Sequence, residues 1–221
     1  MTPFIALLAR DLRLSVREGG GAALALVFFA LVATLVPLGV GSDLALLAKV
    51  GSGVLWVGAA LAALLSLDRL FQADYEDGSL DLIALSPLSL EGTAAAKILA
   101  HWLSIGLPLT LFSPILSVFF GLSAPAVMAL TLSLAIGTPA VSAMGAILAS
   151  LTLSVRRGGL ILPLLVLPLL VPVVIFGAGM AVEVQTGLAN GAPRFLLAFS
   201  LATTLLSPFV TAMAVRLNLA G

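Results

Sequence analysis

The sequence predicts an all-α membrane protein with six transmembrane helices and an N-terminal amphipathic helix lying at the membrane interface. Of its 221 residues, 61% are hydrophobic and 9% are charged, and the mean hydropathy is +1.25. Soluble domains carry roughly 45–50% apolar and about 25% charged residues, so the surplus apolar surface must face lipid. The apolar runs are continuous over about 20 residues rather than alternating, which indicates helices and excludes barrel strands.

The chain divides into an amphipathic opening segment and six apolar segments. In residues 4–18, four apolar side chains would share one helical face, with the arginines roughly opposite, so we expect these arginines to face anionic lipid head groups. Glycines at 19–21 then form a hinge into the first span. The four apolar residues of the opening segment are Ile5, Leu8, Leu12 and Val16. The predicted spans are 22–40, 44–67, 98–120, 126–153, 160–182 and 195–215, in one transmembrane domain over residues 1–221.

The basic residues predict how these spans are oriented, because short cytoplasmic loops are enriched in Lys and Arg. With the N-terminus inside, eight basic residues lie on the inner side and two on the outer side. We therefore expect a multi-pass protein of the bacterial inner membrane with cytoplasmic N- and C-termini and a cytoplasmic loop over residues 68–97. The inner residues are Arg10, Arg13, Arg17, Arg69, Lys97, Arg156, Arg157 and Arg216, and the outer ones are Lys49 and Arg194.

The sequence lacks the residues of most catalytic and cofactor sites. It has no cysteine and one histidine, so a single chain cannot build a zinc site or a paired-histidine haem site. It also lacks a Gly-x-x-x-x-Gly-Lys-Ser/Thr phosphate loop for ATP. The formal net charge of zero gives no reason to expect nucleic acid. We therefore expect a non-catalytic membrane subunit that holds no cofactor or metal by itself.

The spans contain no acidic or basic residue at mid-depth, which disfavours transport driven by protons or sodium. His101 and Trp102 lie near the inner end of the third predicted span. They can form an interfacial belt with a helix-to-helix hydrogen bond, act in coupling, or contact a cofactor. In the fourth span, small residues would allow close packing on another helix, including that of a second copy. These residues are Gly137, Ser142, Gly145 and Ala149.

The 68–97 loop holds six of the ten acidic residues. Ser79 is expected to cap a short helix that Ser86-Pro87 ends, and Ser89 to cap the helix that becomes the third span. Such a helix with an acidic approach and an apolar face suits docking of a soluble partner, although a solvated loop that avoids the anionic membrane surface would have the same composition. The acidic residues are Asp68, Asp74, Glu76, Asp77, Asp81 and Glu91, and the apolar face comprises Leu82, Ile83 and Leu85.

At this loop the sequence resembles the haem exporter protein B family, which supplies a membrane permease of the ABC transporter of cytochrome c maturation. The resemblance is carried by Leu67-Asp-Arg-Leu-Phe-Gln-Ala-Asp-Tyr-Glu-Asp-Gly-Ser-Leu-Asp-Leu. Further matching segments are Ser86-Pro-Leu, Ala96-Lys, Ala100-His-Trp-Leu, Gly106-Leu-Pro-Leu and Ser113-Pro. The length, the six spans, the arginine-bearing N-terminal helix and the Arg156-Arg157 pair extend the resemblance over the whole chain.

This resemblance implies a permease of the type-2 ABC exporter architecture, acting in haem export or delivery for c-type cytochrome biogenesis. It implies two copies of this chain in a complex with a cytoplasmic ATPase subunit that binds ATP, a haem-handling membrane subunit and a small accessory subunit. The complex would serve a periplasmic haem chaperone. The loop would couple to the ATPase through Asp68, Arg69, Asp74, Tyr75, Glu76, Asp77, Gly78, Asp81, Ser86, Pro87 and Glu91.

Two other functions fit the same pattern. One is a permease of the same architecture that moves a lipid, a polysaccharide or a drug. The other is an assembly factor in which ATP-driven motion releases a bound cofactor without any substrate crossing this subunit.

Overall fold

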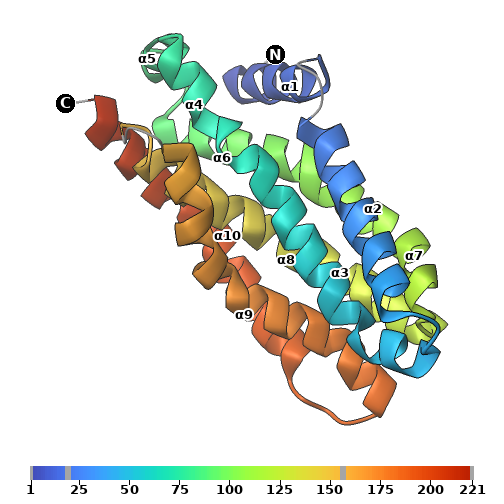
Figure 1. The fold of residues 1–221 in the computed structure, drawn as a ribbon. Coiled ribbons are helices and arrows are strands. Elements are labelled where there is room, and N and C mark those ends of the chain that lie inside the picture. The colour runs from blue at the N-terminus through green and yellow to red at the C-terminus, as the bar shows by residue number, and fades with distance from the viewer. Residues whose placement is uncertain (1, 18–20, 155–157, 220–221) are drawn as a thin grey trace.

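The computed structural model describes residues 2–17, 21–154 and 158–219, and the regular secondary structure in these ranges is helical. As the sequence predicts, six helical segments of the described chain are long and apolar enough to cross a membrane. They pack side by side as one elongated bundle (Figure 1). The bundle consists of α2 (Gly21–Val40), α3 (Leu44–Leu67), α6 (Leu90–His101), α7 (Leu107–Ser117), α8 (Ala124–Leu151), α9 (Gly158–Thr186) and α10 (Ala192–Leu219).

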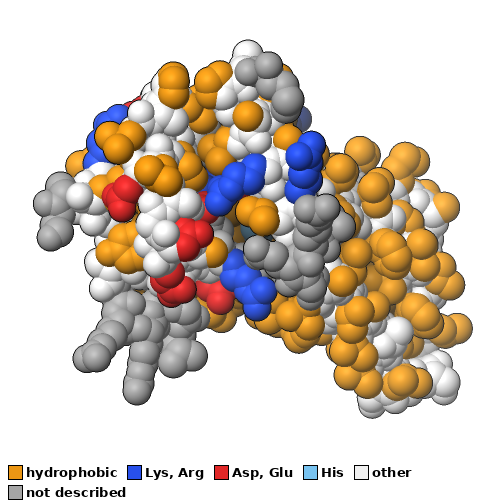
Figure 2. Space-filling view, turned by 90° about the horizontal axis from the view of Figure 1, so that it is seen from above, with side chains coloured by type: hydrophobic (Ala, Val, Ile, Leu, Met, Phe, Trp, Pro, Cys, Tyr) orange, Lys and Arg blue, Asp and Glu red, His pale blue; other side chains and the backbone are white. Residues whose placement is uncertain are grey.

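The two ends of the bundle differ in what covers them. At one end α1 (Pro3–Arg17) lies across the helices, and α4 (Arg69–Glu76), α5 (Ser79–Ala84) and the last turns of α10 lie at the same end (Figure 1). We refer to this as the charged end, because acidic and basic side chains gather on it while apolar side chains cover the flank of the bundle (Figure 2). The opposite end carries the turns at 41–43, 121–123 and 187–191.

The helix that becomes the third predicted span begins well before residue 98, at the cap predicted for it. Ser89 caps α6 as predicted, with its Oγ accepting from the backbone N–H of Gly92 at 3.1 Å, and the helix starts at Leu90. The prediction placed Lys97 at the end of the cytoplasmic loop. The side chain is in fact buried inside the protein, where it has carboxylate partners.

This segment also changes its helical winding in the middle. Residues Trp102–Gly106 form a π-helical turn, η1, in which the N–H of Leu107 donates to the carbonyl of Trp102. Pro108 follows after Leu107 and has no N–H to offer the preceding turn, and a proline at this point favours such a bulge. The π-turn keeps the span continuous into α7, which ends in the 3₁₀ turn η2 (Val118–Phe120).

The centre of the bundle is built around Trp56 on α3, which is fully buried. Its indole N–H donates to the Ser133 hydroxyl on α8 at 2.8 Å. Two glycines make room for the ring: a Cβ on Gly137 of α8 would lie 2.5 Å from Trp56 Cη2, and a Cβ on Gly177 of α9 would overlap the indole. The absence of side chains at these positions lets α8 and α9 pack directly on α3.

The small residues of the fourth span pack within the chain rather than presenting a free surface to a second copy. Ser142 contacts His101 of α6, Ala149 is buried, and a Cβ on Gly145 would overlap Leu67 of α3. The expectation of close helix packing is therefore correct, but the neighbouring helices belong to the same chain.

The N-terminal helix forms as predicted, but its arginines do not all face lipid. The guanidinium of Arg10 turns inward and pairs with Asp74 of α4, whereas Arg13 is exposed. Two further expectations, the hinge glycines Gly19 and Gly20 and the Arg156-Arg157 pair, lie outside the described residues.

Candidate functional site

The predicted loop between the second and third spans is a helical hairpin. After the single residue Asp68, α4 continues from α3, and the chain then turns at Gly78 into α5. Gly78 has a φ of 76°, a left-handed conformation that favours glycine. Asp77 stabilises the turn, because its carboxylate accepts from the N–H of Ser79 at 2.8 Å. Hydrogen bonds from Ser79 hold the pKa of Asp77 below its ordinary value.

The prediction that Ser79 caps α5 is wrong. Gly78 occupies the cap position, and Ser79 is the first helical residue. The Ser79 hydroxyl donates instead to Oδ1 of Asp74 at 2.8 Å. A tertiary hydrogen bond across the hairpin thus replaces the local cap, and it ties the start of α5 to α4.

The outer face of α5 is apolar and exposed. Leu82 is 70% exposed and Leu85 is 84% exposed, whereas Leu80 on the other face is buried against the bundle. Asp81 is also exposed beside them. A short helix with two exposed leucines and acidic neighbours has the character of a docking surface, because exposed apolar patches with polar rims mark interaction sites. We refer to this surface, comprising Glu76, Asp81, Leu82 and Leu85, as the hairpin face.

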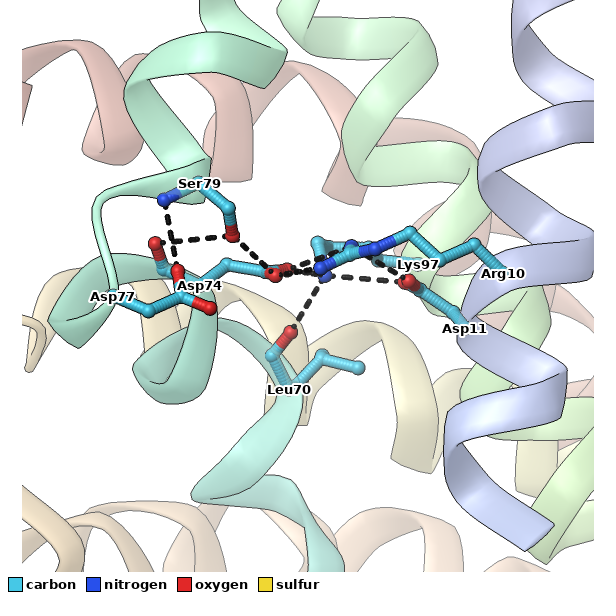
Figure 3. Close-up of polar contacts among 7 residues, drawn as sticks. All are labelled: Arg10, Asp11, Leu70, Asp74, Asp77, Ser79 and Lys97. Atoms are coloured by element: carbon cyan, nitrogen blue, oxygen red, sulfur yellow. Dashed lines mark hydrogen bonds and ion pairs between the residues drawn. The ribbon is translucent and has the colours of Figure 1, made fainter. Parts of the chain in front are cut away.

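Four charged side chains beneath the hairpin form a cluster that joins three helices (Figure 3). The Lys97 ammonium of α6 lies 2.5 Å from Asp74 of α4 and 3.1 Å from Asp11 of α1. Arg10 of α1 donates to both carboxylate oxygens of Asp74. The hydrogen bond to Asp74 raises the pKa of Arg10, so this residue stays charged.

Burial makes this cluster a rigid connection. Lys97 is 2% exposed, donates also to the carbonyl of Leu70 at 3.1 Å, and lies 5.4 Å from the centre of the Phe71 ring. Removing one partner of such a pair leaves an uncompensated buried charge, which typically costs about 3–5 kcal/mol. The first helix, the hairpin and the third span are therefore held in one arrangement at the charged end.

A cavity of about 160 Å³ lies under α1, next to this cluster. Asp74, Lys97 and Arg69 line it on one side, and His101 and Ser104 line it toward the bundle. Pockets that hold drug-sized ligands measure about 300–1,000 Å³. The cavity is thus large enough for several water molecules and smaller than such a pocket.

Both ring nitrogens of His101 are engaged by hydroxyls of neighbouring helices. Nε2 lies 3.0 Å from Ser66 Oγ on α3, and Nδ1 lies 2.9 Å from Ser142 Oγ on α8. Each hydroxyl can donate to or accept from the ring, according to which nitrogen carries the proton, and the Ser66 hydroxyl also lies 3.1 Å from the carbonyl of Ala63. Trp102 donates to the Thr138 hydroxyl at 3.1 Å. The expectation of a helix-to-helix hydrogen bond at this pair is confirmed.

The residues predicted for the coupling loop differ in how far they are buried. Asp74 is buried in the charge cluster, and the other members are exposed or half-buried. The side chain of Glu91 pairs with Arg216 near the end of α10 at 2.5 Å, which links α6 to the last helix. The exposed members are Asp68, Arg69, Glu76, Asp77, Asp81 and Pro87, and the half-buried ones are Tyr75, Gly78, Ser86 and Glu91.

Sequence reasoning missed the partners that complete these networks. Lys97 counted only as a loop cation, although its place among apolar residues of a predicted helix signals a buried charge that needs a carboxylate. Arg10 and Asp11 come from a segment 86 residues away from Lys97, and no local pattern indicates their pairing. Ser66 and Ser142 are likewise single hydroxyl residues in apolar runs, and nothing in those runs indicates that they bond to His101.

Comparisons with known proteins agree with this architecture. The family model described as CcmB protein matches residues 2–218. Among curated relatives, heme exporter protein B of Paracoccus denitrificans is 54% identical over 218 residues, covering 97% of this chain and 99% of the relative. The protein of the same name from Rhodobacter capsulatus is 53% identical over 215 residues, with 97% and 99% coverage.

A less similar relative also matches over nearly the whole chain. Heme exporter protein B of Escherichia coli K12 is 38% identical over 210 residues, covering 95% of this chain and 96% of the relative. The match thus includes the N-terminal helix, the hairpin and all six long helices. This multi-pass membrane protein belongs to the CcmB protein family.

Proposed function

We propose that this chain is the permease subunit of an ATP-driven haem export complex in c-type cytochrome biogenesis, and that it receives force from a separate ATPase through the hairpin face. The names of the relatives support the substrate. The observation that carries the mechanical part is the hairpin, which is exposed and apolar on one side and anchored by buried ion pairs on the other.

The charge cluster gives this force a path into the membrane. A displacement of α5 would move α4 through the turn at Gly78 and the Ser79–Asp74 hydrogen bond. From Asp74 it would pass to Lys97 on α6 and to Arg10 on α1. Because α6 continues into the third span, a push on the hairpin tilts that span. The π-turn at Trp102–Gly106 is the natural place for it to bend.

In this proposal the charged end faces the cytoplasm. The eight-to-two division of basic residues supports that orientation. The chain would act as a pair of copies with the ATPase, a haem-handling membrane subunit and a small accessory subunit, and would serve a periplasmic haem chaperone. ATP binds the ATPase subunit, because this sequence has no phosphate loop.

The size of the cavity at the charged end favours a second form of the proposal. At about 160 Å³ it falls below the range of pockets for drug-sized ligands. Both His101 nitrogens already have hydroxyl partners, so a haem iron would have to displace one of them. We infer that haem does not bind in this cavity but is handled at a surface shared with another subunit, and that this chain supplies motion.

The test is reconstitution of the purified complex in vesicles with an acceptor chaperone inside. ATP is added outside, where the ATPase is exposed, and haem on the acceptor is measured by its absorption. One arm supplies haem outside the vesicles, and the other supplies it already bound to the haem-handling subunit. An ATPase-dead complex is the control in both arms.

ATP-dependent loading of the acceptor in either arm supports the proposed function, and loading only in the second arm supports the motion-only form. Hydrolysis of ATP without haem transfer in both arms would contradict it. ATP-dependent movement of a labelled lipid, polysaccharide or drug in place of haem would favour the alternative permease functions.

A further inference from the structure

A groove on the surface of the bundle runs along α3 toward the end opposite the charged end. It lies between α2 and α9, which both pack on α3 (Figure 1), and its volume is about 540 Å³. Its walls are apolar apart from one lysine near the end and one serine in the floor. Its lining includes Val36 of α2, Lys49, Gly53 and Val57 of α3, and Ala178 and Val182 of α9.

Among the described residues that line this groove, Lys49 is the charged one. It is exposed and forms no ion pair within the described ranges. The described acidic residues of the same end each accept a backbone hydrogen bond and form no ion pair with Lys49: Asp43 accepts from the N–H of Leu46, and Glu183 accepts from the N–H of Asn190. The ammonium of Lys49 is therefore available to an anion from outside the chain.

The depth of Lys49 matches a lipid head group. It lies five residues inside the start of α3 at Leu44, which is roughly 8 Å along the helix axis. From Lys49 to Val57 the groove continues for about 12 Å toward the middle of the bundle. The groove is thus complementary to an anionic phospholipid: the positive charge of Lys49 lies where the phosphate would be, and the apolar channel lies where an acyl chain would be.

We propose that this groove binds one anionic phospholipid, with Lys49 on the phosphate and an acyl chain over Gly53. The groove is preformed, because Gln185 of α9 donates to the carbonyl of Ala48 on α3 at 3.3 Å and holds the two helices together at its end. The bound lipid belongs to the outer leaflet in the orientation proposed above. The binding itself does not depend on that orientation or on the transported substrate.

A lipid accounts for the groove better than a protein helix does. A helix seated here would have to supply a carboxylate to Lys49 from within an apolar span, where ionisable residues are rare. The membrane surrounds the groove with phospholipid in any case, and attraction of an anionic head group to a Lys near the surface is a general effect.

Two substitutions test the head-group contact and the acyl channel separately. Lys49→Gln removes the charge and keeps most of the length of the side chain. Gly53→Leu fills the channel, and it does so without a clash at its first atom, because a Cβ on Gly53 meets no other atom within 4 Å. Matched controls are Arg194→Gln, the other basic residue of that end, and Gly39→Leu, whose Cβ is equally free but lies outside the groove.

The full chain is purified in mild detergent and titrated with phosphatidylglycerol or phosphatidylcholine, and bound lipid is counted by native mass spectrometry. The wild type should retain phosphatidylglycerol preferentially. Lys49→Gln should weaken its binding about fivefold, Gly53→Leu should weaken binding of both lipids, and both controls should match the wild type. Equal retention of the two lipids by the wild type, or unchanged phosphatidylglycerol binding in Lys49→Gln, would overturn the proposal.

A second measurement identifies a different occupant. The natural chain has no cysteine, so Gly53→Cys introduces a single thiol in the channel. In membranes this thiol should react with a lipid-soluble maleimide and form no cross-linked pair with a short bifunctional reagent. Efficient cross-linking of two copies would show that a second chain covers the groove, and would also overturn lipid binding there.

Discussion

The ammonium of Lys97 on α6 lies 2.5 Å from the carboxylate of Asp74 on α4, and both side chains are buried at the charged end of the bundle. This pair joins the hairpin between the second and third spans to the body of the third span. Arg10 and Asp11 extend it to the N-terminal helix. Three segments that are far apart in the sequence thereby meet at one point, directly beneath the face proposed to receive the ATPase.

Removing one member of this pair should destabilise the chain strongly. We expect Asp74→Ala to lower the free energy of unfolding by about 3–5 kcal/mol, because Lys97 and Arg10 lose their shared carboxylate in a buried site. Glu91→Ala is the control, since its partner Arg216 is largely exposed and the loss should be about 0–1 kcal/mol. Thermal unfolding in detergent measures both, and equal effects of the two substitutions would refute a buried role for Asp74.

The double replacement Asp74→Leu with Lys97→Met should recover much of the stability lost in either single variant, because buried ion pairs can be exchanged for apolar groups of similar size. It should not recover function, since the Ser79 and Arg10 contacts to Asp74 are lost with the charge. A stable variant with normal cytochrome c maturation would show that the cluster serves folding alone.

The glycines around Trp56 should tolerate no side chain. Gly177→Ala would force a methyl group into the indole, which cannot move freely because its N–H is bonded to Ser133. We expect a loss of about 1–3 kcal/mol from overpacking. Gly53→Ala adds the same methyl group in open space on α3 and should be neutral or stabilising. Comparable losses for both would contradict the packing described for Trp56.

His101 should be dispensable for haem in the complex but needed for packing. His101→Ala removes hydrogen bonds to Ser66 and Ser142 and leaves their hydroxyls without this partner, so we expect a loss of about 1–3 kcal/mol. The haem absorption of the assembled complex should stay unchanged. If the complex assembled normally and its haem spectrum disappeared, a direct contact between His101 and haem would be the better account.

Thiol labelling should place the two ends of the bundle on opposite faces of the membrane. Asp81→Cys on the hairpin and Leu188→Cys in the turn after α9 are suitable, because both positions are exposed. The neighbouring glycines Gly78 and Gly191 are less suitable, since each has a positive φ that strains other residues. In intact cells we expect an impermeant maleimide to label the Leu188→Cys variant and not the Asp81→Cys variant. Labelling of both from outside would exclude the proposed topology.

Local patterns in the sequence predicted the elements of this fold well. Continuous apolar runs predicted the six long helices, and Ser89 followed by Leu90 predicted the start of the third. These features depend on neighbouring residues alone. The same is true of the short helix α5, whose apolar face was expected at Leu82, Ile83 and Leu85; the two leucines are exposed and Ile83 is half-buried.

Pairing between helices set most of the parts that the sequence did not predict. Lys97 is buried in the helix of the third span because carboxylates from two other helices surround it. The Ser79 hydroxyl donates across the turn to Asp74 rather than capping α5, a choice that local sequence does not reveal. A hydropathy profile assumes that each charged side chain faces either water or lipid. It contains no information about a partner from a distant segment. At the charged end such partners determine which acidic residues are buried and which are exposed for docking.

The central claim is that force from an ATPase enters through the exposed face of α5, and Leu85 tests it most directly because it is 84% exposed and contributes little to the fold. The complex is assembled with Leu85→Glu, and with Leu188→Glu as a control for an added charge on an exposed leucine at the opposite end. Co-purification of the ATPase and cytochrome c maturation are measured together. We predict that Leu85→Glu inserts normally but loses the ATPase or uncouples its hydrolysis from maturation, while Leu188→Glu behaves as the wild type. Normal ATPase retention and normal maturation with Leu85→Glu would contradict the claim.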